Sequence, residues 1–423
     1  MSGLATAVRV PQATGRRMAA AITFAVLGLV QILVLGRYSH AGDATFALSL
    51  PGASVTVPSL HVPAAAVCYA LGAATLVLAA VRAAFDLGKA ARRWILAAVL
   101  LFFIVSLLCW ADAGNAIPLN LVNLLQVTLI SSIPLILGAL SGCMCERSGV
   151  INIAIEGQFL VGAFTAAVVA SAFGTLWGGL IGGSLAGGLV GALLAVFAIK
   201  YLVDQIILGV VLNFLALGLT DFLFERALVP YQNRLNSPAT FSAIKIPGLG
   251  DIPIIGPIFF DSTILLYITY VMIVVVQVGL FSTRWGLRTR AIGEHPLAAD
   301  TVGIRVLGTR YRNVILGGLI AGIGGVYLTI GSVGSFGEDT SSGLGYIALA
   351  AMIFGRWTPL GSVGAALIFG FATSLEQIMS TLNTPIPSNI LLMAPYIATI
   401  VAVAGLVGKV RPPKADGKPY VKA

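Results

Sequence analysis

Long apolar runs separated by short polar segments dominate the pattern of this 423-residue chain. A membrane-spanning helix needs roughly 20 apolar residues to cross about 30 Å of hydrocarbon. Runs near that length lie at residues 18–36, 62–81, 94–111, 117–140, 153–173, 177–199, 205–224, 263–281, 313–331, 360–379 and 390–407. A further run, 344–357, is too short to span comfortably and favours a tilted, broken or re-entrant segment. The pattern predicts an all-α fold, a polytopic transmembrane helical bundle of about 12 spans.

The polar stretch at 146–158 interrupts this pattern most sharply. It places Glu146, Asn152, Glu156, Gln158 and two glycines between apolar runs. In hydrocarbon, non-helical backbone survives only where it lines a cavity or is buried in protein, because unpaired N–H and C=O groups are costly there. We therefore expect a broken helix at this point, with Glu156 on or beside a transport pathway.

A second glycine-rich break, at 331–339, precedes the short 344–357 run. It resembles the break after Leu140, and an odd number of membrane spans separates the two breaks. Two segments separated by an odd number of spans cross the membrane in opposite directions. Transporters whose substrate site forms between discontinuous helices near the midplane show such inverted repeats. The pattern predicts an inverted internal repeat with broken or re-entrant segments.

Composition and charge place the chain in a membrane. Hydrophobic residues make up 58% of it and charged residues 10%, with a mean hydropathy of +0.98. With about twelve crossings and the N-terminus inside, only four of the 25 Lys and Arg residues fall outside, namely Arg37, Arg226, Arg234 and Lys245. Both termini are therefore expected in the cytoplasm. The net charge of +9 follows from this topology and gives no reason to expect a nucleic-acid partner.

Polar and aromatic side chains within or beside the breaks are the candidates for a substrate pathway. They are Asn123, Gln126, Asn152, Glu156, Gln158, Asn213, Phe336, Tyr346 and Glu376. Each has a structural alternative. Asn213 and Gln126 can hydrogen-bond between helices, and Glu156 can pair with backbone N–H groups at the start of a half-helix. Glu376 can be a structural residue of an apolar span.

The arginine-rich segment 284–312 contains a short helix signal. Pro296 suits a first helical turn, Glu294 is an acid at the positive end of the helix dipole, and Gly303 can end the helix. The signal predicts a helix of about two turns outside the membrane. Such a helix is either a surface connector or a docking element.

In the docking interpretation, the helix presents Leu297, Ala298 and Ile304 between basic flanks to a groove on a cytoplasmic partner. A partner seated there would transmit its movement to the spans.

The sequence resembles the permease subunits of ATP-binding-cassette (ABC) importers for nucleosides and simple sugars. These subunits belong to the branched-chain amino acid/ribose permease superfamily. Three blocks of sequence carry the resemblance: 146–157 with 161–163 behind it, 290–304 and 343–357. The resemblance covers about residues 94–407. It implies an importer permease in a bacterial inner (plasma) membrane, paired with a second permease, identical or paralogous. It also implies an ABC ATPase subunit and an external substrate-binding lipoprotein.

The middle block resembles the coupling helix that sits on the ATPase. By that resemblance the coupling residues are Arg290, Gly293, Glu294, Pro296, Leu297, Ala298, Ala299, Asp300 and Gly303. We therefore divide the chain into an N-terminal extension with two spans (1–93), a permease core (94–408) and a basic cytoplasmic tail (409–423).

Motifs for catalysis or nucleotide binding are missing from the sequence. It contains no G-x-x-x-x-G-K-[ST] phosphate loop, so ATP would be bound by a separate subunit and no cofactor is expected. The three histidines lie in expected loops, with no Ser/His/Asp or metal-ligand constellation. We expect a permease moving nucleosides by alternating access, and not an enzyme. The alternatives are a simple-sugar ABC permease, an ion-coupled secondary transporter working through Glu156 or Glu376, and a non-transporting membrane scaffold.

Overall fold

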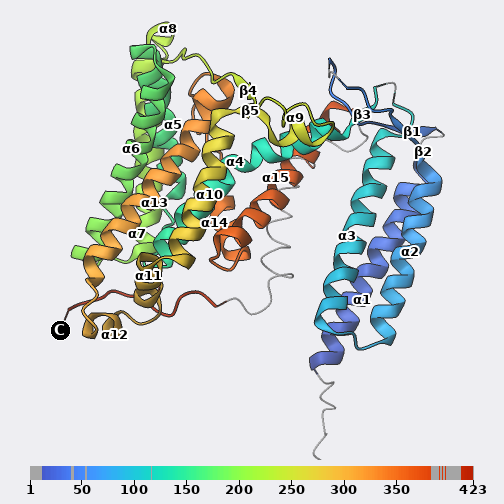
Figure 1. Cartoon of the computed structure of the whole chain (residues 1–423), viewed down its shortest axis with the longest axis horizontal. Helices are drawn as coiled ribbons and strands as arrows, with labels where there is room; N and C mark the ends of the chain where they lie inside the picture. The colour runs from blue at the N-terminus through green and yellow to red at the C-terminus, as the bar shows by residue number, and fades with distance from the viewer. Residues whose placement is uncertain are drawn as a thin grey trace, which may run out of the picture. The chain divides into compact units, whose positions relative to one another are not determined.

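The computed structural model describes residues 12–39, 42–52, 55–115, 117–382, 390, 393, 396 and 411–422. Within these residues, ten helices are long and apolar enough to cross a membrane (Figure 1). Each coincides with one of the apolar runs, which confirms the multi-pass helical fold. The run at 390–407 lies almost entirely outside the described residues. The short run forms α14 (Leu344–Phe354), 11 residues long.

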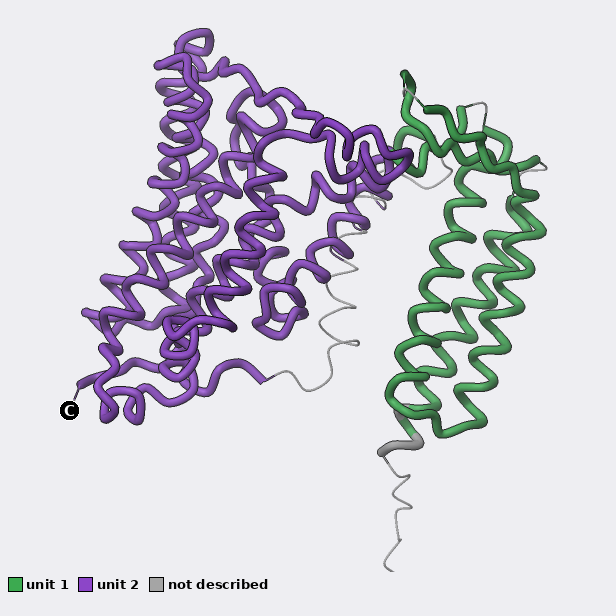
Figure 2. The backbone as a smooth tube through the Cα atoms, in the orientation of Figure 1, with its two compact units in different colours: residues 1–122, 378–386 green, residues 123–377, 387–423 purple. Residues whose placement is uncertain are grey.

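The chain divides into two compact units, the first comprising Met1–Val122 and Ile378–Ile386 (Figure 2). The helices of this unit are α1 (Gln12–Val30), η1 (Gln31–Gly36), α2 (Ala64–Ala84) and α3 (Lys89–Asp112). Its strands are β1 (Asp43–Ala47), β2 (Leu60–Pro63) and β3 (Leu119–Asn120), in the sheet order β2-β1-β3. The third helix groups with the first two here, whereas the sequence division at residue 93 placed it in the permease core.

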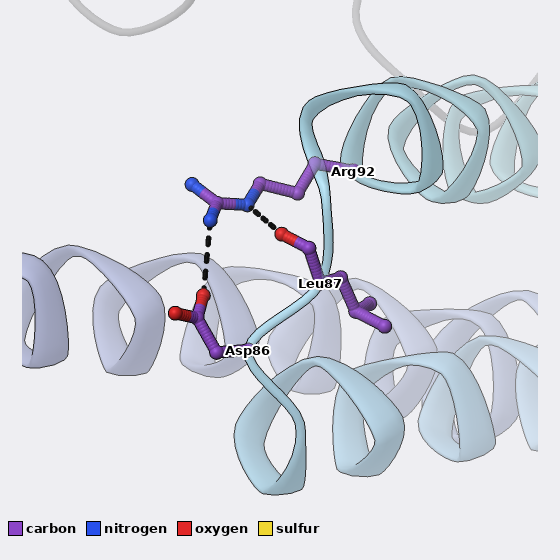
Figure 3. Close-up of polar contacts among 3 residues, drawn as sticks. All are labelled: Asp86, Leu87 and Arg92. Carbon is purple, nitrogen blue, oxygen red and sulfur yellow. Dashed lines mark hydrogen bonds and ion pairs between the residues drawn. The ribbon is translucent and has the colours of Figure 1, made fainter.

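One polar side chain near each end of α3 holds that end in place. At its start, Arg92 donates to the Asp86 carboxylate at 2.9 Å and to the Leu87 carbonyl at 2.6 Å, which closes the α2–α3 turn (Figure 3). At its end, the buried Asp112 carboxylate accepts from the backbone N–H groups of Thr45 and Leu119, at 2.6 and 3.0 Å. Asp112 thereby joins α3 to two strands of the sheet.

The second unit comprises Asn123–Gln377 and Pro387–Ala423. Its long helices are α4 (Leu121–Glu146), which starts at the unit boundary, α5 (Ile155–Phe173), α6 (Leu176–Ala195), α7 (Gln205–Leu223), α10 (Ile264–Ser282), α13 (Val306–Leu328) and α15 (Pro359–Thr381). The π-helical turns η2 (Val196–Lys200), η3 (Phe224–Leu228) and η4 (Thr329–Val333) extend α6, α7 and α13.

Short elements cover the two ends of this unit. One end carries α8 (Gln232–Leu235), β4 (Ala243–Lys245), α9 (Ile255–Phe259) and β5 (Asp261–Thr263). The opposite end carries α11 (Arg284–Glu294) and α12 (Pro296–Thr301), close to the labelled C-terminus (Figure 1). Strand β4 pairs antiparallel with β5 in a two-stranded sheet that the helical pattern did not predict.

Helices α5, α6 and α13 pack closely through glycines. A Cβ atom at Gly187 on α6 would lie 2.5 Å from the Gly322 Cα atom on α13, and one at Gly325 would overlap the Phe159 carbonyl on α5. Small residues let helix backbones approach in lipid, where no hydrophobic force drives helices together. These three helices form the rigid core beside which the polar residues lie.

The segment 284–312 differs from its prediction. It holds two helices and the first turns of α13, where one short helix in a long loop was expected. Thr283 begins α11 by accepting from the Gly286 N–H, and Glu294 ends α11 and does not start the next helix. The cap of α12 is His295, whose Nδ1 accepts from the Ala298 N–H at 3.1 Å.

Candidate functional site

The non-helical segment 147–154, between α4 and α5, is buried or half-buried, and side chains from other helices hold three of its backbone groups. The Ser148 carbonyl accepts from Arg310 Nε at 3.1 Å, the Ile151 N–H donates to Gln205 at 2.8 Å, and the Ile153 carbonyl accepts from Asn213 at 2.9 Å. Buried backbone groups require such partners. A non-helical segment is present where a break was expected, between two helices that are each long enough to span a membrane, and side chains from α7 and α13 stabilise it.

Glu156 lies in the first turn of α5 with 5% of its surface exposed. One carboxylate oxygen accepts from the Ser341 hydroxyl at 2.5 Å and the Gly343 N–H at 2.8 Å, and the other accepts from the Gly345 N–H at 2.6 Å. The N-cap of α14 is Gly343, which has no side chain to satisfy the first N–H groups of the helix. Glu156 supplies that cap from another helix, so one negative charge faces the positive ends of two helix dipoles.

The close approach of α5 and α14 requires a glycine at position 345. A Cβ atom there would lie 2.5 Å from the Glu156 backbone nitrogen and 2.6 Å from its Oε2 atom. Real Cβ atoms do not come so near a backbone atom. The α5–α14 junction, defined here as Glu156, Ser341, Gly343 and Gly345, is therefore closed by backbone as well as by side-chain contact.

Asn213 on α7 contacts residues on both helices of the same junction. Its Oδ1 accepts from the Gly157 N–H at 2.8 Å, and its Nδ2 donates to the Ile153 carbonyl and, at 3.1 Å, to the Tyr346 hydroxyl. Tyr346, on the first turn of α14, keeps 47% of its surface exposed. Among the predicted pathway residues, Tyr346 therefore combines a link to the junction with an open aromatic face.

Asn152 and Gln158 form a separate buried pair. Asn152 Nδ2 donates to Gln158 Oε1 at 3.1 Å and to the Ser141 hydroxyl at 3.2 Å, and Gln158 donates back at 3.4 Å. Both amides are buried. They tie the non-helical segment to α4 and α5, and their polar groups are used within the protein.

The remaining predicted pathway residues lie apart from this junction. Gln126 on α4 donates to the Asp261 carbonyl at 3.3 Å, and Asn123 is exposed three residues before it. Phe336 is buried against Phe164 and Phe224, with ring centroids 5.3 and 6.0 Å away. Its main chain exchanges two hydrogen bonds with Asn236.

Glu376 is half-buried on α15, two residues after Ser374, whose hydroxyl donates to the Leu124 carbonyl. Of the two predicted carboxylates, only Glu156 therefore joins the junction.

Helix α12 presents an apolar side to the surface. Leu297 and Val302 are 54% and 74% exposed, and Ala298 is exposed as well. The opposite side is buried, with Ala299 packed on Ile292 of α11. Gly303 takes a φ of +82° just beyond the helix, where a glycine was expected to end it.

Ile304, which the docking interpretation placed on the exposed side, and the predicted coupling residue Arg290 both pack against the protein. Ile304 packs inward against Ile292, Ala299 and Val306, so it does not belong to the exposed side. Arg290 lies over the Phe281 ring, 4.9 Å from its centroid, and is half-buried. Its guanidinium is therefore held by packing and is not a free surface charge. Pro296 and Asp300 are partly buried, and Glu294 is exposed.

Gly293, in the last turn of α11, lies against the first sequence block. A Cβ atom at this position would overlap the Arg147 carbonyl, so glycine is required there by close backbone approach. The second block thus lies directly against the first.

Glu146 and Arg147 hold the third block, a role that sequence reasoning missed. Trp357 Nε1 donates to the Glu146 carboxylate at 2.5 Å, and Arg147 Nε donates to the Trp357 carbonyl at 2.7 Å. Arg356 and Trp357 both have positive φ, +57° and +53°, a strained conformation for side-chain-bearing residues that surrounding contacts must maintain. The signal available in the sequence was a charged pair directly after an apolar run.

Comparison with known proteins gives matches over the part of the chain that contains these residues. The model of a family described as "Branched-chain amino acid transport system / permease component" matches residues 124–407. The chain is 43% identical over 320 residues to the guanosine ABC transporter permease protein NupQ of Bacillus subtilis, covering 72% of this chain and 99% of that protein. It is 39% identical over 318 residues to the nucleoside ABC transporter permease protein NupC of Lactococcus lactis, covering 72% and 100%.

A more distant relative is the glucose ABC transporter permease protein TsgB13 of Haloferax volcanii, 28% identical over 254 residues, which cover 58% of this chain and 67% of that protein. No solved structure matches the chain significantly. The family match covers well over half of the chain and contains every element of the α5–α14 junction and of the α11–α12 end. This protein belongs to the family of branched-chain amino acid transport system permease components.

Proposed function

We propose that this chain is the permease subunit of an ABC importer for nucleosides. The similarity to two nucleoside permeases over nearly their whole length carries this proposal. A permease component is not itself an enzyme. The energy for transport would come from ATP hydrolysed on a separate ATPase subunit, and the chain would work with a second permease, identical or paralogous, and an external binding lipoprotein.

The exposed side of α12 supports a docking role over a surface connector. Leu297, Ala298 and Val302 leave apolar surface uncovered on a short helix whose other side is firmly packed. Exposed apolar patches of this kind mark interaction sites. The proposed coupling helix is therefore α12, presented on the packed support of α11.

The dimensions of α14 support a re-entrant segment. Its 11 residues give a length of about 16 Å, roughly half of the hydrocarbon thickness. Its first turn lies at Glu156, and Trp357, just beyond its end, lies at Glu146. The helix thus runs antiparallel to the non-helical segment 147–154.

The charge distribution supports a cytoplasmic location for the α11–α12 end. Residues 284–312 hold six arginines, and the described 411–422 segment, which lies at the same end, adds Arg411, Lys414, Lys418 and Lys422. Cytoplasmic segments carry such an excess. Alternating access would then change the α5–α14 junction when ATPase subunits move α12.

Glu156 argues against the ion-coupled alternative. Its carboxylate already accepts three hydrogen bonds, two of them from backbone N–H groups at a helix start, so it serves as a cap. A carboxylate that carries protons or sodium must exchange its partners in each cycle.

Reconstitution into vesicles tests the proposal. The permease is co-expressed with the ATPase genes of its native host and assayed with its binding protein for uptake of labelled guanosine. We expect uptake that requires ATP and persists when ionophores collapse the ion gradients. Uptake without ATP, lost with the ion gradient, would exclude an ABC importer. Competition by ribose or glucose but not by nucleosides would move the assignment to sugars.

A further inference from the structure

The 411–422 segment packs into the protein although its composition is that of a basic surface tail. Ala415 and Tyr420 are each 5% exposed. Chain segments near a terminus are usually poorly ordered unless specific contacts tie them down. The contacts here come from two different directions, α11–α12 on one side and the α4–α5 connection on the other.

The first set of contacts joins the segment to the helices beside α12. The Ala415 N–H donates to the Gly293 carbonyl at the end of α11, at 2.8 Å. The Tyr420 ring lies in a buried cluster with Ile292, Ala299 and Val306. Ala299 is a residue of α12 itself, so the segment supports the inner side of the helix whose outer side is exposed.

The second set joins the segment to the non-helical residues before α5. Arg310, buried on α13, donates through Nη1 to the Lys418 carbonyl and through Nε to the Ser148 carbonyl, both at 3.1 Å. The planar guanidinium suits such a two-directional bridge, which an ammonium group cannot reproduce. Gly149 has a φ of +86°, and a Cβ atom there would lie 3.1 Å from the Ala415 carbonyl.

Carboxyl groups reinforce this second set. The buried Asp416 carboxyl faces the Glu146 carboxyl at the end of α4. Glu146 is also the acceptor for Trp357. The segment therefore contacts the end of α4, which holds the turn after α14.

We propose that residues 413–420 transmit the movement of α12 to the non-helical segment 147–154 and so to the α5–α14 junction. This inference rests on the proposed function, because it assumes that α12 is moved by an ATPase. The chain of contacts runs from Ala299 through Tyr420 and Lys418 to Arg310 and Ser148. Residues 147–154 lead directly into the first turn of α5, where Glu156 caps α14.

The segment also lies where a docked partner would reach it. Tyr420 and Lys422 line a cleft of about 400 Å³ together with Asp300 on α12 and residues 303–308, which connect α12 to α13 and form the first turn of α13. A subunit seated on Leu297 and Val302 would therefore lie beside the segment. Movement of α12 and movement of the segment would be linked at this edge.

The test compares Tyr420→Ala with two matched variants in the full-length permease. Tyr420→Phe keeps the ring that packs on α12, and Val421→Ala changes the neighbouring side chain, which is 66% exposed. Each variant is co-purified with the ATPase from the native host and reconstituted with the binding protein. Guanosine uptake per ATP hydrolysed and backbone hydrogen exchange at 147–154, with and without ATP, are the readouts.

We expect Tyr420→Ala to retain the ATPase and to lower uptake per ATP by at least about fivefold, the lower range of typical coupling between sites. The ATP-dependent change in exchange at 147–154 should disappear as well, although exchange at α12 should still respond. Tyr420→Phe and Val421→Ala should match the wild type in both measurements.

Wild-type uptake per ATP and exchange in Tyr420→Ala would overturn the inference. Loss of the ATPase from that variant would overturn it too, because the segment would then be part of the docking surface and not a transmitting element. The wild-type protein alone tests the proposed function, since absence of ATP-dependent guanosine uptake refutes that function. The exchange measurement can still be made on the purified permease–ATPase complex in that case.

Discussion

The Glu156 carboxylate on α5 accepts a hydrogen bond from the Gly345 backbone N–H on α14 at 2.6 Å, joining residues that are 189 positions apart in the sequence. A charged acceptor strengthens such a bond. In a membrane, where water cannot replace a lost partner, opening of this junction would require other donors for the carboxylate. This property suits a transport pathway that must alternate.

Removal of the charge at Glu156 should loosen the junction without stopping ATP-driven transport. Glu156→Gln keeps the shape but leaves one acceptor oxygen for three donors, which costs about 1–3 kcal/mol for buried groups left unsatisfied. We expect a lower melting temperature in detergent and an altered rate of uptake that ionophores do not change. Glu376→Gln, a carboxylate on α15 outside the junction, is the control. Complete loss of ion-gradient-dependent accumulation would indicate an ion carrier.

Added volume at Gly345 should separate α5 from α14. Gly345→Ala places a methyl group 2.5 Å from the Glu156 nitrogen, and overpacking typically costs about 1–3 kcal/mol. Gly364→Ala on α15 is the matched control, because nothing lies within 4 Å of its Cβ position. There, replacing a helical glycine should be neutral or stabilise by about 0.5–1 kcal/mol. Equal thermal stabilities of the two variants would contradict the described approach of the helices.

A charge on the exposed side of α12 should detach the ATPase. Leu297→Asp introduces a carboxylate into the apolar contact, and we expect loss of ATPase co-purification with unchanged membrane insertion. Leu287→Asp on α11, at 62% exposure, serves as the comparison. Arg290 is unsuitable as a docking probe, because it is packed on Phe281. A Leu297→Asp permease that still carries a fully stimulated ATPase would rule out α12 as the coupling helix.

Docking of the 411–422 segment should weaken as pH rises. Burial raises the pKa of Asp416 from 3.8 to about 7, while the facing groups, Glu146 on α4 and Arg310 on α13, lower it. A carboxyl group whose pKa is higher in the docked state contributes its full stabilisation of that state at pH values below its undocked pKa. For Asp416, this stabilisation is lost as the pH rises from about 4 through about 7.

Hydrogen exchange or limited proteolysis of the segment at pH 6 and pH 8 measures this effect. We expect faster exchange at the higher pH after correction for the intrinsic rate, and no such difference in Asp416→Asn, which stays neutral. Equal protection of the wild-type segment at both pH values would show that Asp416 does not titrate in this range.

Substrate preference should depend on Tyr346 more than on the buried polar residues. Tyr346 exposes an aromatic face on which a base can stack, whereas Asn152 and Phe336 are buried. We expect Asn152→Ala and Phe336→Ala to slow uptake without changing which nucleosides compete, and Tyr346→Ala to change their relative rates. Tyr346→Phe, which removes only the bond to Asn213, should keep the preference. A changed competition pattern in Asn152→Ala would place that amide on the pathway.

The apolar pattern was sufficient to locate the spans, because hydrocarbon thickness fixes their length and composition. It was also sufficient to mark 146–158 as an interruption of the apolar pattern, because polar groups are costly in a membrane unless they have partners. It did not locate α11, whose helix depends on a Thr283 cap within a stretch of arginines. The short strands also escaped prediction, because they depend on pairing between distant segments.

The partners in the site could not be read from the sequence for a related reason. Two of the three donors to Glu156 are backbone N–H groups, which all residues except proline offer, so the sequence marks its partner helix only weakly. Arg310 has a carbonyl partner at Lys418 in a segment whose composition suggests a solvated tail. Asn123, Gln126, Phe336 and Glu376 were selected by residue type and by position in the sequence. For the three that lie on helices, the distance from the junction depends on how each helix is rotated, which the apolar pattern does not determine.

The bridge from Arg310 to the Lys418 carbonyl has a consequence for biosynthesis. The acceptor is 108 residues downstream of the arginine, so a ribosome must synthesise all of α14 and α15 before the guanidinium can obtain this partner. Until then, the Arg310 guanidinium at the start of α13 lacks one of the hydrogen bonds that it makes in the folded protein. Nascent chains of this length are therefore candidates for recognition by membrane quality control, and completion of the α11–α12 end follows insertion of the helices that surround it.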